Sequence, residues 1–191
     1  SEYYGNSILY TFPGVKSGKF TYYDPSTGKK AKIGNYSDGK MDGEVTVFDN
    51  DYITHKFQYK NGMRNGTCYY YFFQSPIVKQ EWNYCNDTLC GISKEWYKKD
   101  TLYQVIEYKN GQAISTTEFW SNGNLWMKYF RTEKGEKDSS ETLWYKDGQL
   151  NYIKTYKSNL LNGKYEEYYP SGQLKIRSTY QNDSLEGKFE S

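Results

Sequence analysis

The sequence predicts an all-β protein, an elongated antiparallel meander of about seven stacked β-hairpin repeats of about 24 residues each, with essentially no helix. Three observations predict this fold. A turn motif with two glycines four residues apart, Tyr59 to Gly66 in its clearest form, recurs along the whole chain. Three columns of aromatic or apolar residues keep their spacing from repeat to repeat. Each repeat also carries a second turn signal, so it divides into two short strands.

The closing glycine of the motif, taken as position zero, sets the repeat boundaries. Equivalent positions are Gly18, Gly43, Gly66, Gly91, Ser115, Ser139, Gly163 and Gly187. A single repeat domain is therefore predicted over residues 18–191, with a truncated unit from 187. Residues 1–17 are predicted to be an irregular lead-in, with room for one capping strand over residues 7–12.

The three columns are defined by their distance from position zero. Seven residues before zero, all repeats but one have a tyrosine, and Thr132 is the exception: Tyr36, Tyr59, Tyr84, Tyr108, Tyr156 and Tyr180. Five residues after zero, every repeat has an aromatic residue: Tyr23, Phe48, Tyr71, Trp96, Trp120, Trp144 and Tyr168. Thirteen before zero the residue is apolar except at Lys30: Ile53, Val78, Leu102, Trp126, Leu150 and Leu174.

The alternation of residue types along each predicted strand indicates which of its faces is buried. The strand ending at Tyr59 alternates Ile53, His55, Phe57 and Tyr59 with polar residues. Period-two alternation of this kind predicts one buried and one solvated face. The repeat from Ser115 is the irregular one. Its second turn, residues 131–140, is long and charged, and is predicted to be a solvated loop.

The three cysteines match no zinc pattern. Cys85 and Cys90 flank a four-residue turn between repeats, which places them across a hairpin at disulfide distance. Two interpretations stay open: a disulfide, or two thiols in a reducing compartment. Cys68 follows position zero by two residues and is predicted to be a small core residue.

Composition and motifs argue against several functions. A net charge of +2 gives no argument for nucleic acid, and no apolar run is long enough for an integral membrane segment. The single histidine, His55, lies on the apolar side of its strand. Glu166 and Glu167 are adjacent in a strand, so they point to opposite faces. We therefore expect no enzyme activity, no cofactor and no metal site.

The repeat resembles a known family. Gly163 to Leu174 and Tyr180 to Gly187 follow the pattern Gly-x-aromatic, Tyr-x-x-Gly-x-Leu and Tyr-x-Asn. This pattern resembles the MORN repeat, and more closely the MORN-variant repeats of bacterial proteins, some of them antitoxin-like. The resemblance covers roughly residues 18–189. It implies stacked hairpins and a non-catalytic scaffold. Because many bacterial members are exported, it favours the periplasm, the cell surface or secretion, and a cytoplasmic location stays open.

Two functions follow from these patterns. The first is a scaffold that binds another protein through its solvated strand face or sheet edges. The alternative is a carbohydrate or cell-wall binding module, similar to the aromatic repeats of glucan-binding proteins, although the Gly-Trp pair of those repeats is missing. The candidate binding aromatics are Tyr71, Trp96, Trp120, Trp144 and Tyr168. We expect this ladder to be structural, with its gaps filled from the intervening strand by the tyrosine and the aliphatic column.

Overall fold

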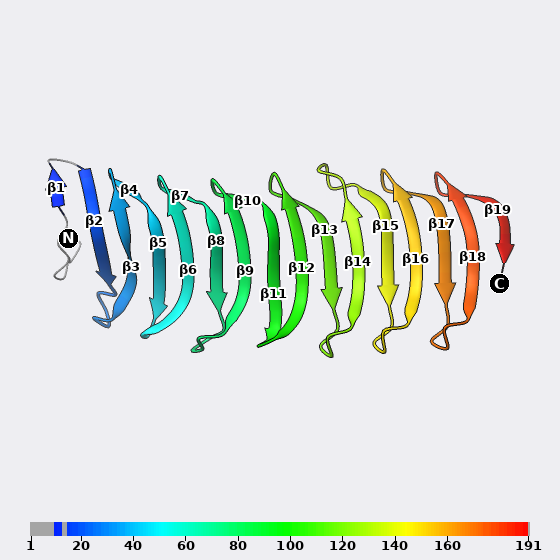
Figure 1. Ribbon diagram of the computed structural model, residues 1–191, viewed down its shortest axis with the longest axis horizontal. Helices are drawn as coiled ribbons and strands as arrows, with labels where there is room; N and C mark the ends of the chain where they lie inside the picture. Colours follow the sequence, from blue (N-terminus) through cyan, green and yellow to red (C-terminus); the bar gives the residue numbers. More distant parts are fainter. Residues whose placement is uncertain (1–9, 13–14, 191) are drawn as a thin grey trace. The chain divides into compact units, whose positions relative to one another are not determined.

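A computed structural model of the chain describes residues 10–12 and 15–190. The prediction of an all-β antiparallel meander is confirmed, since all strands in these ranges are antiparallel and the ranges contain no helix. No helix long and apolar enough to cross a membrane therefore occurs in the described residues. The chain divides into two compact units, residues 1–90 and 91–191. In each unit, neighbouring strands follow the order of the chain (Figure 1).

The first unit contains three full hairpins and several short strands. Its described strands are β1 (Tyr10–Phe12), β2 (Val15–Tyr23), β3 (Lys30–Ser37), β4 (Lys40–Met41), β5 (Gly43–Asp49), β6 (Tyr52–Lys60), β7 (Met63–Arg64), β8 (Gly66–Tyr71), β9 (Val78–Cys85) and β10 (Thr88–Leu89). The predicted lead-in, residues 1–17, lies outside the described residues at 1–9 and 13–14, and its last three residues are not irregular, because β2 begins at Val15. The remainder of the capping strand is β1, which pairs with the start of β2.

The second unit is a meander of longer strands. They are β11 (Gly91–Lys98), β12 (Thr101–Lys109), β13 (Gln112–Phe119), β14 (Leu125–Arg131), β15 (Lys137–Trp144), β16 (Leu150–Lys157), β17 (Leu160–Tyr168), β18 (Leu174–Gln181) and β19 (Ser184–Glu190). Each strand pairs with the next, from β11–β12 to β18–β19.

The Asn/Asp-Gly turns join one repeat to the next. Asn61 and Gly62 both have positive φ, 53° and 84°, a conformation that Asn and Gly adopt at the lowest cost. The Gly62 N–H donates to the carbonyl of Met41 in the preceding repeat, at 2.8 Å. At some of these turns the hydrogen bonds run in both directions. The Asp183 N–H donates to the Leu161 carbonyl at 2.9 Å, and the Leu161 N–H donates to the Asp183 carboxylate at 2.7 Å.

The irregular repeat, which begins at Ser115, has one residue fewer at its start than the repeat that begins at Gly163. In β16–β17, Lys154 pairs with Tyr165 and Tyr156 with Leu161, so three residues bulge opposite one. In β12–β13, Glu107 pairs with Ser115 and Tyr108 with Ala113, so the bulge has one extra residue, not two. Consistent with this, Ser139 has a φ of 62°, whereas Ser115 is not among the positive-φ residues.

The missing residue shifts the columns of this repeat by one. The structural equivalents of Trp96 and Leu102, which pair across β11–β12, are Phe119 and Leu125 across β13–β14. Counting along the sequence assigned Trp120 and Trp126 to those columns. In the structure each of them lies one residue after the true column position. The turn 132–136, one residue longer than its counterparts, restores the count before β15. The predicted loop at 131–140 is therefore shorter, since β14 ends at Arg131 and β15 begins at Lys137.

The first unit has an apolar central row. Phe20 pairs with Gly34, Val45 with Phe57, and Cys68 with Trp82. Phe20, Val45 and Cys68 are at most 1% exposed. The prediction that Cys68 is a core residue is confirmed.

Candidate functional site

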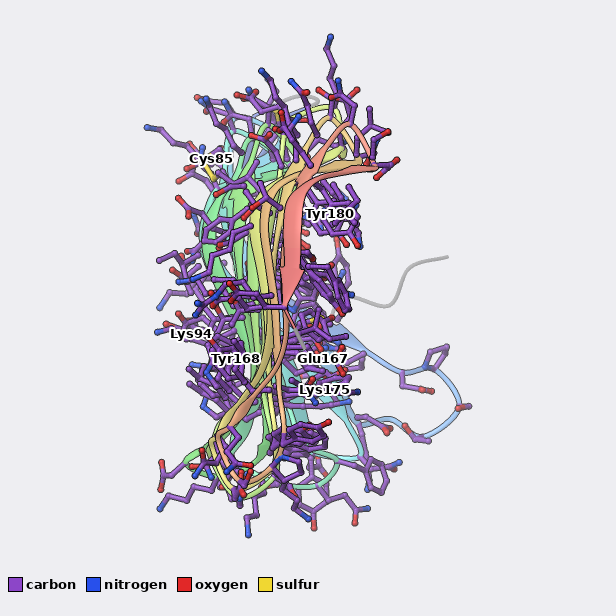
Figure 2. All side chains as sticks on the ribbon, turned by 90° about the vertical axis from the view of Figure 1, so that its right-hand side faces the viewer. Cys85, Lys94, Glu167, Tyr168, Lys175 and Tyr180 are labelled. Carbon is purple, nitrogen blue, oxygen red and sulfur yellow. A yellow bond between two sulfur atoms is a disulfide. The ribbon has the colours of Figure 1, made fainter. Side chains whose placement is uncertain are left out.

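The two faces of the unit 91–191 differ in character. Figure 2 places Tyr180, Glu167 and Lys175 on one side of the sheet, which we call the tyrosine face, and Lys94 and Tyr168 on the other, the lysine face. Directly opposed residues in a sheet share a face, so the strand register extends both assignments. The central row of the tyrosine face is Ser93, Ile106, Thr116, Tyr129, Glu141, Lys154, Tyr165 and Ser178. The matching row of the lysine face is Lys94, Val105, Thr117, Lys128, Thr142, Ile153, Glu166 and Arg177.

The five candidate aromatics are half-buried, neither enclosed nor freely exposed. Four of them pair with the aliphatic column across their hairpin: Tyr71 with Val78, Trp96 with Leu102, Trp144 with Leu150, and Tyr168 with Leu174. A β-bulge precedes each of these pairs, because the register shifts there by one residue. Trp120 is the exception and lies in the turn after β13.

Trp120 belongs to a second aromatic column, one residue further along, which the sequence reasoning missed. Tyr97 Oη donates to the carbonyl of Phe119 at 3.1 Å, and Trp120 Nε1 donates to the carbonyl of Trp144 at 3.3 Å. Tyr145 Oη donates to the carbonyl of Tyr168 at 2.9 Å. Each ring thus bonds to the backbone of the following repeat. The consecutive aromatic pairs at the hairpin ends, such as Trp144-Tyr145, were the signal for this column.

The sequence predicted that the tyrosine and aliphatic columns both fill the gaps between the candidate aromatics. The prediction is wrong for the tyrosines. The aliphatic residue does oppose the aromatic one, but the tyrosine column lies at the other end of the strands, where Tyr180 pairs with Gly163. Leu174 and Tyr180 are six residues apart on one strand, about 20 Å at 3.3 Å per residue. One aromatic residue cannot contact both. Some of the tyrosines instead lie beneath basic side chains: the Lys137 ammonium is 4.7 Å from the Tyr156 ring centre, and the Arg64 guanidinium is 4.1 Å from that of Tyr84.

Carboxylates are buried on both faces of this unit. On the tyrosine face, Glu141 is 8% exposed; it accepts bonds from Lys137 Nζ at 2.8 Å and Tyr152 Oη at 3.1 Å. On the lysine face, Glu166 is 4% exposed and contacts Lys164 Nζ at 2.7 Å and Arg177 Nε at 2.9 Å. Burial would raise the pKa of Glu166, but these two cations and the Tyr168 hydroxyl outweigh it and lower the pKa.

Glu167 and Glu118 both lie on the tyrosine face, but their carboxylates have different surroundings and their pKa values shift in opposite directions. Glu167 accepts from Lys175 Nζ at 2.6 Å and from Tyr165 Oη at 2.8 Å. These two bonds lower the pKa of Glu167, and burial together with the Glu167 contact raises the pKa of Tyr165 to about 12. Burial alone raises the pKa of Glu118. Glu166 and Glu167 do point to opposite faces, as adjacent strand residues should.

The contacts of the histidine and of the two turn cysteines indicate structural roles. His55 is hydrogen-bonded to Thr54 Oγ1 at 2.8 Å, and its ring lies 4.7 Å from that of Tyr70; burial lowers its pKa. Cys85 and Cys90 form a disulfide, with Cα atoms 5.8 Å apart. Among the described residues, no group of three or more His, Cys, Asp or Glu side chains is placed to hold a metal ion.

The comparisons with known proteins agree with the repeat geometry. A model of the MORN repeat variant matches residues 137–158 and 161–182, two adjacent repeats that contain β15–β18. The resemblance to the MORN-repeat family is therefore confirmed. No curated protein matches the chain. MORN repeats are a non-enzymatic repeat type, and generally act as scaffolds that bind proteins or membranes.

Proposed function

We propose that this chain is a non-catalytic scaffold that binds another protein through an open face of its sheet, at the envelope of a bacterial cell. The observation that carries the proposal is the position of the aromatic columns. Tyr97, Trp120 and Tyr145 are hydrogen-bonded to the next repeat, and the neighbouring column is half-buried against aliphatic residues. These rings hold neighbouring hairpins together. The central rows of the tyrosine face and the lysine face are therefore the surfaces available for recognition.

The envelope location is supported by two features. The MORN-variant form is commonest in bacterial proteins, many of them exported, and the Cys85–Cys90 disulfide is typical of oxidising compartments. Fractionation of the source cells with an antibody to the chain tests this part. Recovery of the protein in the soluble cytosolic fraction, with both thiols reduced, would refute it.

Photocrosslinking tests the binding function. Benzoylphenylalanine placed at Met127 samples the tyrosine face, and at Thr179 the lysine face. We expect one position to yield a crosslinked protein, which is then purified and shown to bind the unmodified chain at micromolar concentration or tighter. A purified partner that fails to bind the chain would overturn the proposal, as would the absence of protein crosslinks at both positions.

The carbohydrate alternative has one observation in its favour. An open hollow of about 430 Å³ between two hairpin turns is lined by Leu102, Phe119 and polar residues that include Asp100 and Asn122. An apolar floor with a few polar groups suits a sugar. Binding on a glycan array that is lost on Phe119→Ala, in a variant that still folds, would favour this function over the first.

A further inference from the structure

Within the described part of the chain, the Glu118 carboxylate has neither a hydrogen-bond nor an ion-pair partner. It lies half-buried on the tyrosine face, opposite Gln104 on β12 and Met127 on β14. No hydrogen bond or ion pair to its carboxylate occurs among residues 10–12 and 15–190. By contrast Glu141, Glu166 and Glu167 each contact at least one lysine or arginine.

Glu118 and Glu167 occupy the same place in their repeats. Glu167 pairs with Ile176 and the next residue pairs with Leu174, which leaves Lys175 as the extra residue of the bulge. Glu118 pairs with Met127 and the next residue with Leu125, which leaves Trp126 as the extra residue. The position from which Lys175 neutralises Glu167 is therefore occupied at Glu118 by an indole ring.

The second donor is also missing. Tyr165 Oη donates to Glu167 at 2.8 Å, and Tyr165 opposes Ser178 in the central row. The residue two positions before Glu118 is Thr116, which opposes Tyr129 in the same row. A threonine side chain is too short to span the distance that the Tyr165 phenol covers. Trp126 and Thr116 therefore stand in this repeat where Lys175 and Tyr165 stand at Glu167, and neither supplies the bond that its counterpart makes.

The two strands that pair with β13 each place an aromatic bulge residue next to the residue that opposes Glu118. Tyr103 is the bulge residue of the preceding hairpin. Tyr103 adjoins Gln104, the residue that pairs with Glu118. Burial, and after it the negative charge of Glu118, raises the pKa of Tyr103. Both bulge rings are fixed by neighbours: Tyr103 packs edge-on against Tyr97, with centres 5.0 Å apart, and Trp126 lies 5.4 Å from Trp120.

We propose that Glu118, between Tyr103 and Trp126, is a subsite for one arginine side chain of a protein partner. This inference rests on the proposed protein-binding function and names the chemistry that the partner must supply. A carboxylate accepts a guanidinium through two parallel hydrogen bonds, and flat aromatic faces attract its charge. Arginine fits better than lysine because its planar head can pair and stack at once. The partner's arginine takes the role that Lys175 has at Glu167.

A peptide titration tests the subsite. The probe is the blocked peptide acetyl-Gly-Gly-Arg-Gly-Gly-amide, and the control is the same peptide with citrulline, a neutral group of the same shape. Binding to the whole chain is followed through the backbone and indole N–H resonances in two-dimensional NMR. We expect the arginine peptide to bind at least about tenfold more tightly than the citrulline peptide, with the largest shifts at Glu118 and Trp126.

Two variants and one matched control locate the effect. Glu118→Gln removes the charge, and Trp126→Lys places in this repeat the lysine that the last repeat has; each should weaken arginine binding at least about tenfold. Glu167→Gln, in the equivalent position with its own lysine nearby, should change it less than about twofold. If one variant fails to fold by circular dichroism, the other still tests the subsite.

The outcomes separate this inference from the proposed function. Equal binding of the two peptides, or unchanged binding by both variants, would overturn the arginine subsite. A crosslinked protein partner whose affinity does not change in Glu118→Gln would also overturn it, and would leave the scaffold function standing. Arginine binding at Glu118 with no protein crosslinked to either face would instead overturn the scaffold function alone.

Discussion

Substituting Gly34 by alanine should destabilise the first unit, because no space exists for one more methyl group. A Cβ at Gly34 would lie 2.8 Å from the Phe20 ring and 2.8 Å from Val45 Cγ2. Both neighbours are 1% exposed, so neither can swing away into solvent. Gly34 is not among the positive-φ glycines, and alanine therefore adds no backbone strain that could mask the steric effect.

The size of the effect follows from the overlap. Ordinary carbon contacts begin near 3.4 Å, so both neighbours must shift by about half an ångström within a closely packed row. Overpacking of this kind costs about 1 to 3 kcal/mol. With an m-value of about 2 kcal/mol per M, the urea midpoint of Gly34→Ala should fall by about 0.5 to 1.5 M.

A double-mutant cycle isolates the clash. Val45→Ala removes one of the two groups that the new Cβ would meet. The destabilisation of the double variant should therefore be about 1 to 2 kcal/mol smaller than the sum of the two single destabilisations. Urea unfolding followed by circular dichroism measures all four proteins, and amide exchange in β3 and β5 assigns the change to this unit. A stability of Gly34→Ala within about 0.5 kcal/mol of the parent, or strict additivity in the cycle, would show that the row is not packed as described.

Two further predictions concern the cysteines and the carboxylates. Alkylation of the native protein without reductant should modify no thiol, because Cys85 and Cys90 are bonded and Cys68 is 0% exposed; unfolding should then add one label by mass, and three labels would contradict the disulfide. The second concerns pH. Because the pKa of Glu118 is raised in the fold, its charge opposes folding above that pKa, so Glu118→Gln should stabilise the protein at pH 7 and have no effect near pH 3. The pKa of Glu166 is lowered, so its stabilisation is present above the unfolded value of about 4.3 and is lost as pH falls through the folded value. Glu166→Gln should therefore destabilise the protein at pH 7 only, and thermal melts of both variants at the two pH values decide the signs.

Much of the architecture was accessible from local patterns. Turn chemistry at Asn61-Gly62 and the alternation from Ile53 to Tyr59 depend only on neighbouring residues, and a repeat multiplies such signals until chance is excluded. The meander and the all-β class followed from them. The placement of Cys85 and Cys90 across one hairpin was equally local, because four intervening residues leave the chain few alternatives.

The assignment of Trp120 to a column depended on the register of paired strands, which counting along the sequence does not reveal. Ser115 begins a repeat with one residue fewer in its bulge, and the turn 132–136 adds one back, so the total spacing conceals the shift and Trp120 was counted into the wrong column. Bulges move register without changing composition.

The sequence by itself therefore determined the repeat and its hairpins, because turn geometry and period-two alternation are properties of short segments. The predicted division into one buried and one solvated face was too simple, since Glu141 and Glu166 are buried on opposite faces. Only the tertiary structure decided which side chains meet across repeats. Lys175 reaches Glu167 while Trp126 stands in the same place beside Glu118. That difference lies in the register of paired strands, which is set by the sum of every bulge and turn between them.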